Sequence, residues 1–255
     1  MGQDFLDQMN RKIVLKTKEP AIVSLVPSIT EFLLDLGANV VGRTKFCIHP
    51  KEQIKNIPII GGTKNFRFDD IYKLNPDLII GNKEENYPEG IKRLELDFPV
   101  WMSDILTLED GREMMTSVAR ICGKRNKGQE LVEKENTVLD RLKNTRKAKI
   151  LYLIWRDPYM AVGKNTYVNS FLSHLGYRNM IKNERYPALS KEQLKNHDPG
   201  EILLSSEPFP FDTKHIEEIK EITGSSSIRL VNGEFYSWYG TRILKLASLI
   251  DQEAY

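Results

Sequence analysis

Cysteine and histidine are scarce in this sequence, whose 255 residues include only 2 Cys and 4 His. The sequence contains no GxSxG elbow, no HExxH pair and no complete P-loop. Gly163 and Lys164 begin a partial P-loop match, but the upstream glycine of a phosphate cradle is missing. No two His have the spacing of a shared metal site. We therefore predict neither a catalytic site nor a closed structural zinc site.

The sequence also lacks an excess of charge of one sign and any long apolar run. Lys and Arg number 37, Asp and Glu number 35, and the formal net charge is +2, which argues against a nucleic-acid partner. No apolar run approaches the ~20 residues of a membrane-spanning helix. The first twenty residues lack the apolar region of a secretory signal. We expect a cytoplasmic chain or one whose signal has been removed.

The two cysteines occupy unrelated positions in the sequence. Cys122 precedes Gly123 at an expected helix end and is interpreted as a buried small apolar residue, whereas Cys47 lies in a predicted loop. We predict two free thiols.

Short apolar runs alternate with amphipathic segments in the first half of the chain. The run at 21–26 precedes a helical pattern in which Ser28 and Glu31 have the spacing of a capping box and Gly37 is a stop signal. The pattern repeats after apolar runs at 57–60, 77–81 and 99–102. Repeated strand–helix units predict a parallel sheet with helices on both faces, in a first α/β lobe over residues 1–123.

One long polar helix is predicted over residues 124–148, and the alternation then resumes. Apolar runs at 149–154, 160–163, 201–206 and 228–231 predict a second α/β lobe over residues 149–255. No linker is rich in Gly, Pro or Ser, so we do not expect loosely tethered lobes. The predicted fold class is α/β, with two Rossmann-like lobes and parallel sheets joined by one long backbone helix.

Aromatic residues gather just after the predicted strands, where parallel α/β sheets bind ligands. This distribution predicts an aromatic-lined cleft between the lobes, which suits a large, flat or partly apolar ligand. The candidate ligand-binding residues are Phe46, Phe66, Glu84, Glu85, Trp155, Arg156, Tyr159, Tyr186, Phe209, Trp238 and Tyr239, to which Arg185 is added as a polar group. The alternatives are that the aromatic residues pack as ordinary core and that the charged residues form surface ion pairs.

Cys47 and His49 are two residues apart in the loop after the second strand of the first lobe. In an extended segment such residues project from the same face, so both are candidates for ligand contact. A second hypothesis is that neutral His49 or a Cys47 thiolate supplies an axial ligand to the metal of a bound macrocycle. A nucleophile–base pair is a third, but no oxyanion partner is identifiable.

Four segments together resemble the substrate-binding proteins of ABC importers for cobalamin, ferric siderophores and haem. They are AIVSLVPSITEFLLDLG (21–37), FRFDDIYKLNPDLIIGN (66–82), YPALSKEQLKNHDPGEILLSS (186–206) and SWYGTRILKLASLI (237–250). The similarity spans nearly the whole chain and is closest to the cobalamin-binding branch. It implies two α/β lobes joined by a backbone helix at about 125–148, a ligand held unaltered between them, a monomer, and a periplasmic or extracytoplasmic location.

The resemblance also implies roles for individual residues. Asp69 and Glu192 match the two carboxylates that dock into arginine pockets on the transporter. If the chain has no membrane partner, they are only acidic residues at helix starts, where the helix macrodipole stabilises a negative charge. Tyr186 stands where a Trp is usual, Tyr159 matches a Phe, and His49 matches a Tyr of the second loop.

Two positions depart from the cobalamin-binding branch, because Thr63 and Asn82 stand where cobalamin binders carry Trp. A corrin ring needs a flat apolar platform, so the polar replacements point instead to haem, a ferric chelate or another metal complex. The candidate ligands are therefore cobalamin, cobinamide, haem and a ferric chelate. We predict a non-catalytic receptor that captures such a ligand, with cobalamin favoured, for an ABC importer. The alternatives are a cytoplasmic carrier or sensor of the same ligand class and, last, an enzyme on this scaffold.

Overall fold

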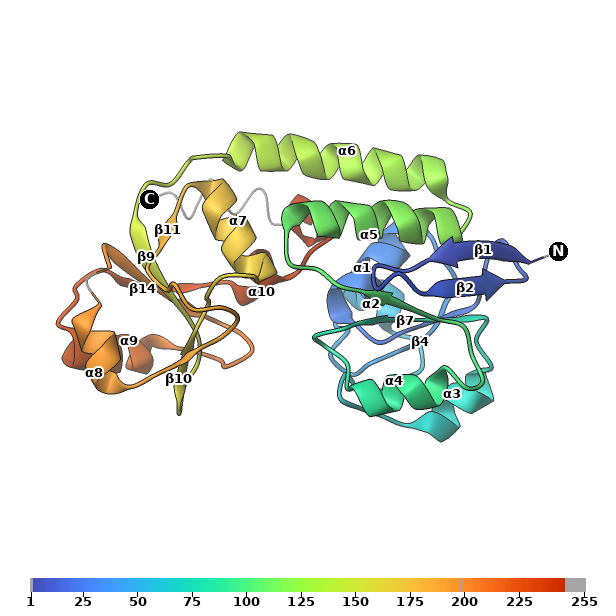
Figure 1. Cartoon of the computed structure of the whole chain (residues 1–255), viewed down its shortest axis with the longest axis horizontal. Coiled ribbons are helices and arrows are strands. Elements are labelled where there is room, and N and C mark those ends of the chain that lie inside the picture. The colour runs from blue at the N-terminus through green and yellow to red at the C-terminus, as the bar shows by residue number, and fades with distance from the viewer. Residues whose placement is uncertain (1, 198, 246–255) are drawn as a thin grey trace. The chain divides into compact units, whose positions relative to one another are not determined.

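The computed structural model describes residues 2–197 and 199–245 (Figure 1). Its chain forms two compact units. Unit 1 comprises Met1–Ile105, Glu109–Asn136 and Tyr239–Tyr255, and unit 2 comprises Leu106–Leu108 and Thr137–Trp238. The sequence-based division differs, because it assigns all of 149–255 to the second lobe and sets 124–148 apart as a helix. The part of that division after residue 245 lies outside the described residues.

A four-stranded parallel sheet organises unit 1, with strand order β4-β3-β7-β8. Its strands are β3 (Ile22–Ser24), β4 (Val40–Arg43), β7 (Leu78–Asn82) and β8 (Val100–Ser103). Helices α1 (Pro27–Leu36) and α5 (Leu108–Ile121) cover one face, and α3 (Phe68–Leu74) and α4 (Pro88–Leu94) cover the other (Figure 1). Strands buried on both faces are continuous apolar runs, which is why the sequence reveals β3, β7 and β8.

Smaller elements complete unit 1. They are the antiparallel hairpin β1 (Gln3–Leu6) and β2 (Lys12–Leu15), the short helix α2 (Lys51–Ile54), and the ribbon β5 (Gly61–Gly62) and β6 (Asn65–Phe66). The strand predicted at 57–60 is wrong, because this segment makes only an isolated bridge between Arg43 and Ile59. Pro58 lies inside it and has no N–H for a strand ladder.

Helix α1 begins differently from the prediction. Its N-cap residue is Val26, Pro27 occupies the first turn, and no side chain caps the N-terminus, so the predicted capping box is not formed. Gly37 does end the helix, with a φ of 75° that favours glycine.

Glu31 is instead buried and binds the C-terminal segment of unit 1. Its carboxylate pairs with Arg242 at 2.8 Å and with Lys245 at 2.8 Å. Asp35, one turn later, pairs with Lys245 at 2.7 Å and accepts a hydrogen bond from Thr241. These pairs attach residues 241–245 to α1.

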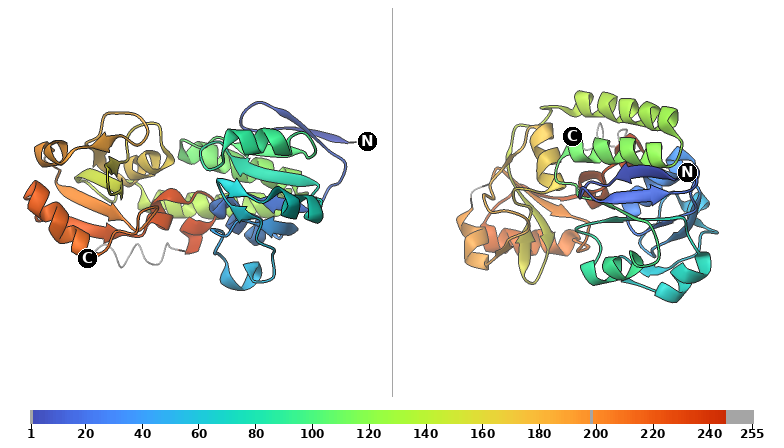
Figure 2. Two further views of the ribbon diagram at one scale, coloured as in Figure 1. Left: turned by 90° about the horizontal axis from the view of Figure 1, so that it is seen from below. Right: turned by 45° about the vertical axis from the view of Figure 1, so that its right-hand side comes forward.

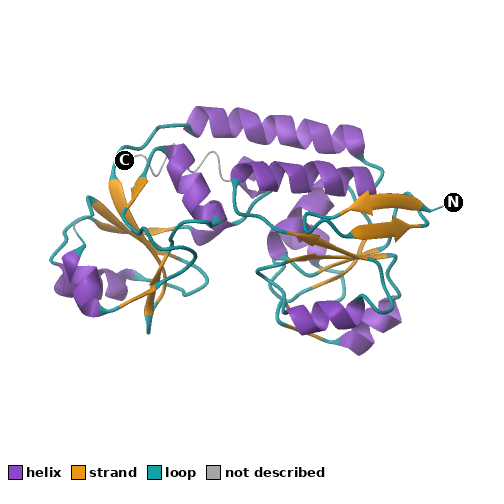
Figure 3. Ribbon diagram, viewed as in Figure 1, coloured by secondary structure: helices purple, strands orange, loops and turns teal. Residues whose placement is uncertain are grey.

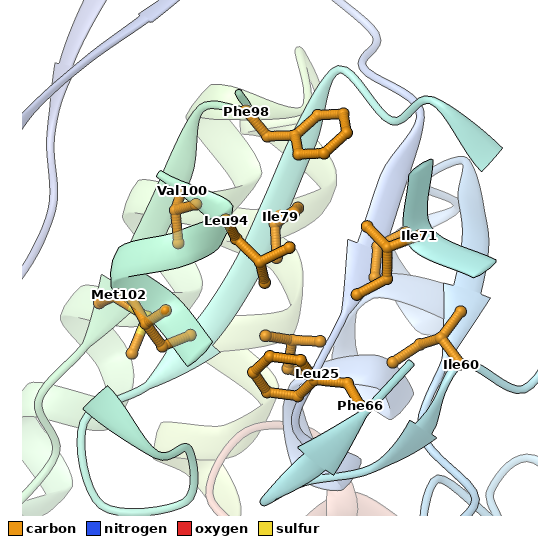
Figure 4. Packing of buried hydrophobic residues seen from close by; sticks show 11 residues of the cluster. Leu25, Ile60, Phe66, Ile71, Ile79, Leu94, Phe98, Val100 and Met102 are labelled. Atoms are coloured by element: carbon orange, nitrogen blue, oxygen red, sulfur yellow. The ribbon is translucent and has the colours of Figure 1, made fainter. Parts of the chain in front are cut away.

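The core of unit 1 on the α3/α4 face is a contiguous apolar cluster, shown in Figure 4. It joins strands, helices and the ribbon through Leu25, Ile60, Phe66, Ile71, Ile79, Leu94, Phe98, Val100 and Met102. Phe66 is 4% exposed, and its ring stacks on Tyr87 with centroids 4.8 Å apart. The Phe66 side chain, a predicted ligand contact, therefore packs as core.

Unit 2 contains a mixed sheet with the order β12-β10-β9-β13-β14, and β11 also pairs with β9. Strands are drawn in orange in Figure 3. Its strands are β9 (Lys149–Trp155), β10 (Tyr159–Ala161), β11 (Arg178–Asn179), β12 (Ala188–Leu189), β13 (Glu201–Ser205) and β14 (Ile228–Val231). Strands β9, β13 and β14 are parallel as predicted, and β11, which was not predicted, is parallel to β9; β10 is antiparallel to β9 and β12. The α/β fold class is confirmed, with this hairpin as the exception to a wholly parallel sheet.

The helices of unit 2 are α7 (Tyr167–Leu175), α8 (Lys191–Asn196), α9 (Thr213–Thr223) and α10 (Gly233–Ser237). Helices α8 and α9 lie side by side, as both views of Figure 2 show. Ser190 and Gln193 form a capping box at the start of α8. This reciprocal pair satisfies two backbone N–H groups and fixes where that helix begins.

Helix α6 (Arg125–Leu142) crosses the division between the units after Asn136. Its buried stripe consists of Gly128, Leu131, Glu135, Leu139 and Leu142, at the spacing of one helix face. Glu135 is the one charged residue in that stripe. No helix among the described residues has both the length and the apolar character needed to cross a membrane.

Candidate functional site

At the carboxyl end of β7, an amide network shapes a turn that carries two acidic residues. Asn82 is buried; its Nδ2 donates to Ser103 Oγ at 3.0 Å, and its Oδ1 accepts from the backbone N–H of Glu84 at 2.8 Å and of Glu85 at 3.1 Å. Asn86 Oδ1 accepts from the Asn82 N–H at 2.9 Å. Both glutamate residues are exposed, and Asn82 has the structural role of shaping the turn that carries them.

The ring of Tyr239 is buried in unit 1 near this acidic turn. Burial raises the pKa of Tyr239, as does the charge of Glu85, whereas hydrogen bonding to Ser28 and Ser103 lowers it. Surrounding protein atoms that desolvate the Glu85 carboxyl, together with the charge of Glu84, raise the pKa of Glu85. Tyr239 thus belongs to unit 1 and remains a neutral phenol beside the acidic pair.

The loop after β4 places Cys47 in the core of unit 1. The Cys47 thiol is 0% exposed and lies 3.0 Å from Thr30 Oγ1 and 3.2 Å from Thr44 Oγ1. Arg43 Nη1 donates to the Cys47 carbonyl at 3.1 Å, which ties the loop down. Burial raises the pKa of the Cys47 thiol, and a neutral thiol is a poor metal ligand because the thiolate is the form that binds metals.

The residues around Cys47 in the same loop are accessible. Phe46 is 50% exposed, Ile48 is also exposed, and His49 is half-buried. Lys45 Nζ lies 4.9 Å from the centroid of the Phe46 ring. Of the predicted pair, His49 therefore remains available for ligand contact, whereas Cys47 packs inward; Cys122 is buried too, and both thiols are free as predicted.

In unit 2, the loops after β9 and β13 form an aromatic cluster. Trp155, at the end of β9, is 39% exposed and meets the edge of Phe209 with centroids 5.8 Å apart. The Phe209 N–H donates to the Ile154 carbonyl at 3.2 Å, which joins the two loops. Phe209 also contacts Phe211 at 4.8 Å. Trp155 is the member of this cluster with the most accessible face.

Arg156 and Tyr159 both bind Glu218 of α9. Arg156 Nε donates to the two carboxylate oxygens at 2.9 and 3.1 Å, and the Tyr159 hydroxyl donates to Oε1. Burial, together with the hydrogen bond to Glu218, raises the pKa of Tyr159 to about 12. Against the opposing effect of burial, hydrogen bonds from Arg156 and Tyr159 lower the pKa of Glu218. The carboxylate is therefore ionised at neutral pH.

The remaining predicted contacts of unit 2 are half-buried. The Arg185 guanidinium lies 5.7 Å from the centroid of the Tyr186 ring, and its Nη1 donates to the Asn165 carbonyl at 2.9 Å. Trp238 Nε1 donates to Glu207 Oε2 at 3.2 Å. Tyr186 and Trp238 are thus each partly accessible, and each has a polar side chain beside it.

Asp69 and Glu192, the predicted docking residues, are exposed in the first turns of α3 and α8. Each unit therefore carries one of them. Among residues 2–197 and 199–245, no three His, Cys, Asp or Glu side chains are placed to hold a metal ion.

Comparison with known proteins gives the family. The model of a family described as periplasmic binding protein matches residues 22–228. The chain belongs to the periplasmic binding protein family. Members of this family bind solutes and are not catalytic, in agreement with the prediction that the chain is not an enzyme.

This periplasmic binding protein is 25% identical over 194 residues to the vitamin B12-binding protein of Vibrio campbellii (strain ATCC BAA-1116), across 72% of this chain and 70% of the relative. It is 26% identical over 215 residues to the uncharacterized ABC transporter substrate-binding lipoprotein YvrC of Bacillus subtilis (strain 168), across 78% and 68%. The apo structure of the periplasmic haem-binding protein RhuT from Roseiflexus sp. RS-1 superposes with a TM-score of 0.79 at 22% identity, covering 92% of this chain and 97% of that one. The structural likeness shows the fold.

Two residues that the sequence reasoning missed organise the loops of this periplasmic binding protein. His215 and Glu218, both in α9, contact the aromatic loop after β13 and the turn after β9. The sequence contained one indication of their role, a spacing of three residues, which places the two side chains on one face of a helix. That signal identifies a shared face but not the loops that pack against it.

Proposed function

We propose that this protein binds a metal-containing macrocycle or chelate of the corrinoid or haem type and delivers it to an ABC importer outside the cytoplasm. The observation that carries the proposal is that each unit has an accessible aromatic side chain at the carboxyl end of a strand, Phe46 in unit 1 and Trp155 in unit 2, in a chain of this family. Aromatic faces suit a flat, largely apolar ring.

The relatives support this ligand class without favouring one member. One is a vitamin B12-binding protein and another is a haem-binding protein. Asn82, which stands where the cobalamin-binding branch carries Trp, is buried and bonded to Ser103, so it offers a ligand no aromatic platform. We therefore propose cobalamin, cobinamide and haem as equal candidates, with a ferric chelate as the fourth.

Delivery to a transporter is proposed from the two exposed acids. Asp69 and Glu192 lie at helix starts on different units, as expected for a pair that docks both units onto a permease. One relative carries the name of an ABC transporter substrate-binding lipoprotein.

Titration of the apoprotein tests the ligand class. Purified protein is titrated with cyanocobalamin, dicyanocobinamide, haemin and a ferric hydroxamate chelate, and absorbance and tryptophan fluorescence are recorded. We expect saturable binding of at least one of them in a 1:1 ratio, with quenching of Trp155. Absence of saturable binding to all four would overturn the proposal.

A further inference from the structure

One face of α9 supports two of the ligand-candidate loops of unit 2, those after β9 and β13. His215 and Glu218 are three residues apart and so share a helix face. The His215 ring meets Phe209 at 5.2 Å and Phe211 at 5.4 Å, on the loop after β13. The Glu218 carboxylate binds Arg156 and Tyr159, on either side of the turn after β9.

The turn between Arg156 and Tyr159 needs such support from outside. Asp157 within it has a φ of 65°, a left-handed conformation that is unfavourable for a residue with a side chain. Glu218 receives one hydrogen-bond donor from each end of this turn. A single carboxylate therefore clamps the turn closed.

The clamp also bears on Trp155. This residue directly precedes Arg156, and its ring rests against Phe209, which His215 supports from α9. His215 is itself fixed, because its Nδ1 accepts from the Asp212 N–H at 2.9 Å and its side chain is buried. The two groups next to Trp155, the Phe209 ring and Arg156, are thus both held by side chains of α9.

Arg156 keeps the capacity to contact a ligand while it is clamped. It pairs with Glu218 through Nε, and 41% of its side chain stays exposed. A guanidinium has five N–H donors in a rigid fork, so fixing Nε fixes the direction of the others. Such a group recognises an acceptor oxygen, for example a carboxylate or an amide carbonyl at the edge of a macrocycle.

We propose that Glu218 is a positioning residue for ligand binding, which aims Arg156 at an acceptor oxygen on the ligand and holds Trp155 against its ring. This inference rests on the proposed function. Glu218 acts through Arg156 and the turn and needs no contact with the ligand.

The test compares Glu218→Ala and Glu218→Gln with Glu217→Ala. Glu217 is the exposed neighbour on α9, and its ion pair with Lys220 is long, at 3.9 Å. Cyanocobalamin, dicyanocobinamide and haemin are the probes, and hydrogen exchange of residues 155–161 is measured without ligand. For each probe that the wild type binds, we expect Glu218→Ala to weaken binding by about tenfold, as for the loss of a charged hydrogen bond. Glu218→Gln, which keeps an acceptor, should lose less, and Glu217→Ala should bind as wild type.

A double-mutant cycle separates positioning from general stability. If Glu218 acts partly through Arg156, the variant with both Arg156→Ala and Glu218→Ala loses less binding free energy than the sum of the two single losses. Wild-type binding by both Glu218 variants, or fully additive losses in the cycle, would overturn the proposal.

Failure of the proposed function gives a different result, because the wild type then binds none of the probes. In that case the hydrogen-exchange measurement, which is made without ligand, still tests whether Glu218 holds the turn after β9. Faster exchange of residues 155–161 in Glu218→Ala than in Glu217→Ala supports the clamp, and equal exchange rules it out.

Discussion

Individual side chains at the strand ends divide into buried and accessible groups that the sequence does not distinguish. Cys47, Phe66 and Tyr159 are buried, whereas Phe46 and Trp155 present accessible faces. All five follow predicted strands, but Cys, Phe and Tyr also fill cores, and only tertiary packing decides between the two uses. The loops were therefore predictable from the sequence, and the orientation of each side chain in them was not.

Trp155 and Trp101 form a matched pair for separating binding from folding. Trp155 is 39% exposed and Trp101 is 0% exposed. We expect Trp155→Ala to weaken ligand binding by about 1 to 3 kcal/mol with little change in melting temperature. Trp101→Ala should instead lower the free energy of unfolding by about 3 to 5 kcal/mol. Calorimetry of ligand binding and of unfolding in both variants checks this, and a large stability loss in Trp155→Ala would contradict it.

His49 and Cys47 differ in the effect that their replacement should have on a bound metal. Half-buried His49 can reach a ligand at the loop surface, whereas Cys47 lies inside. If imidazole coordinates the metal, His49→Ala should shift the absorption bands of bound haemin or cobinamide, while Cys47→Ser should leave them unchanged. Cobalamin that keeps its own lower base should show no shift. Identical spectra of all three bound ligands in wild type and His49→Ala would exclude coordination.

At the scale of elements, apolar runs identified β3, β7 and β8 in unit 1 and β9, β10, β13 and β14 in unit 2. The signal is clearest where a strand is buried on both faces and is apolar throughout. The exception at 57–60 has the same composition, but Pro58 interrupts its hydrogen bonding. Short edge elements such as β5, β6, β11 and β12 have two residues each, too few for any period to be visible in the sequence.

Helix α6 carries a titratable group in its buried stripe. Burial raises the pKa of Glu135 to about 8; the charge of Arg112 opposes this and that of Glu109 adds to it. Its Oε2 has no hydrogen-bond partner among the described residues. Because this folded pKa lies above the ordinary value of 4.5, protonation favours the folded state, and stability falls as the pH rises from about 4.5 to about 8.

Glu135→Gln should remove this pH dependence. At pH 4 the free energies of unfolding of the variant and the wild type differ by some baseline amount. At pH 7 we expect the variant to be more stable than the wild type by about 3 kcal/mol in addition to that baseline. Urea denaturation at both pH values measures it. Exposed Glu133 on the same helix supplies the control Glu133→Gln, which should follow the wild type. If the wild type and Glu135→Gln differ by the same free energy of unfolding at both pH values, the pKa of Glu135 is not raised by folding, and the residue is ionised in the folded protein at pH 7.

At the scale of the whole molecule, charge reversal tests the proposed docking acids. Asp69→Lys and Glu192→Lys change exposed first-turn residues, so we expect folding and ligand binding to be unaffected. Stimulation of the cognate ABC importer's ATPase in proteoliposomes should fall by at least about tenfold, as when like charges meet at an interface. Glu89→Lys changes another exposed first-turn acid, in α4, and should stimulate normally. Normal stimulation by both test variants would leave the two acids as helix-start residues only.

The attachment of residues 241–245 to α1 has a consequence for how the chain is made. A ribosome completes residues 137–238 of unit 2 before it reaches Arg242 and Lys245, which neutralise Glu31 in unit 1. Domains generally fold in the order in which they are synthesised, but here the first unit must wait with a carboxylate that cannot be buried at low cost without its partners. Residues 137–238 of unit 2 are therefore complete before the partners of Glu31 have been made, and a nascent chain stalled before Arg242 cannot neutralise that carboxylate.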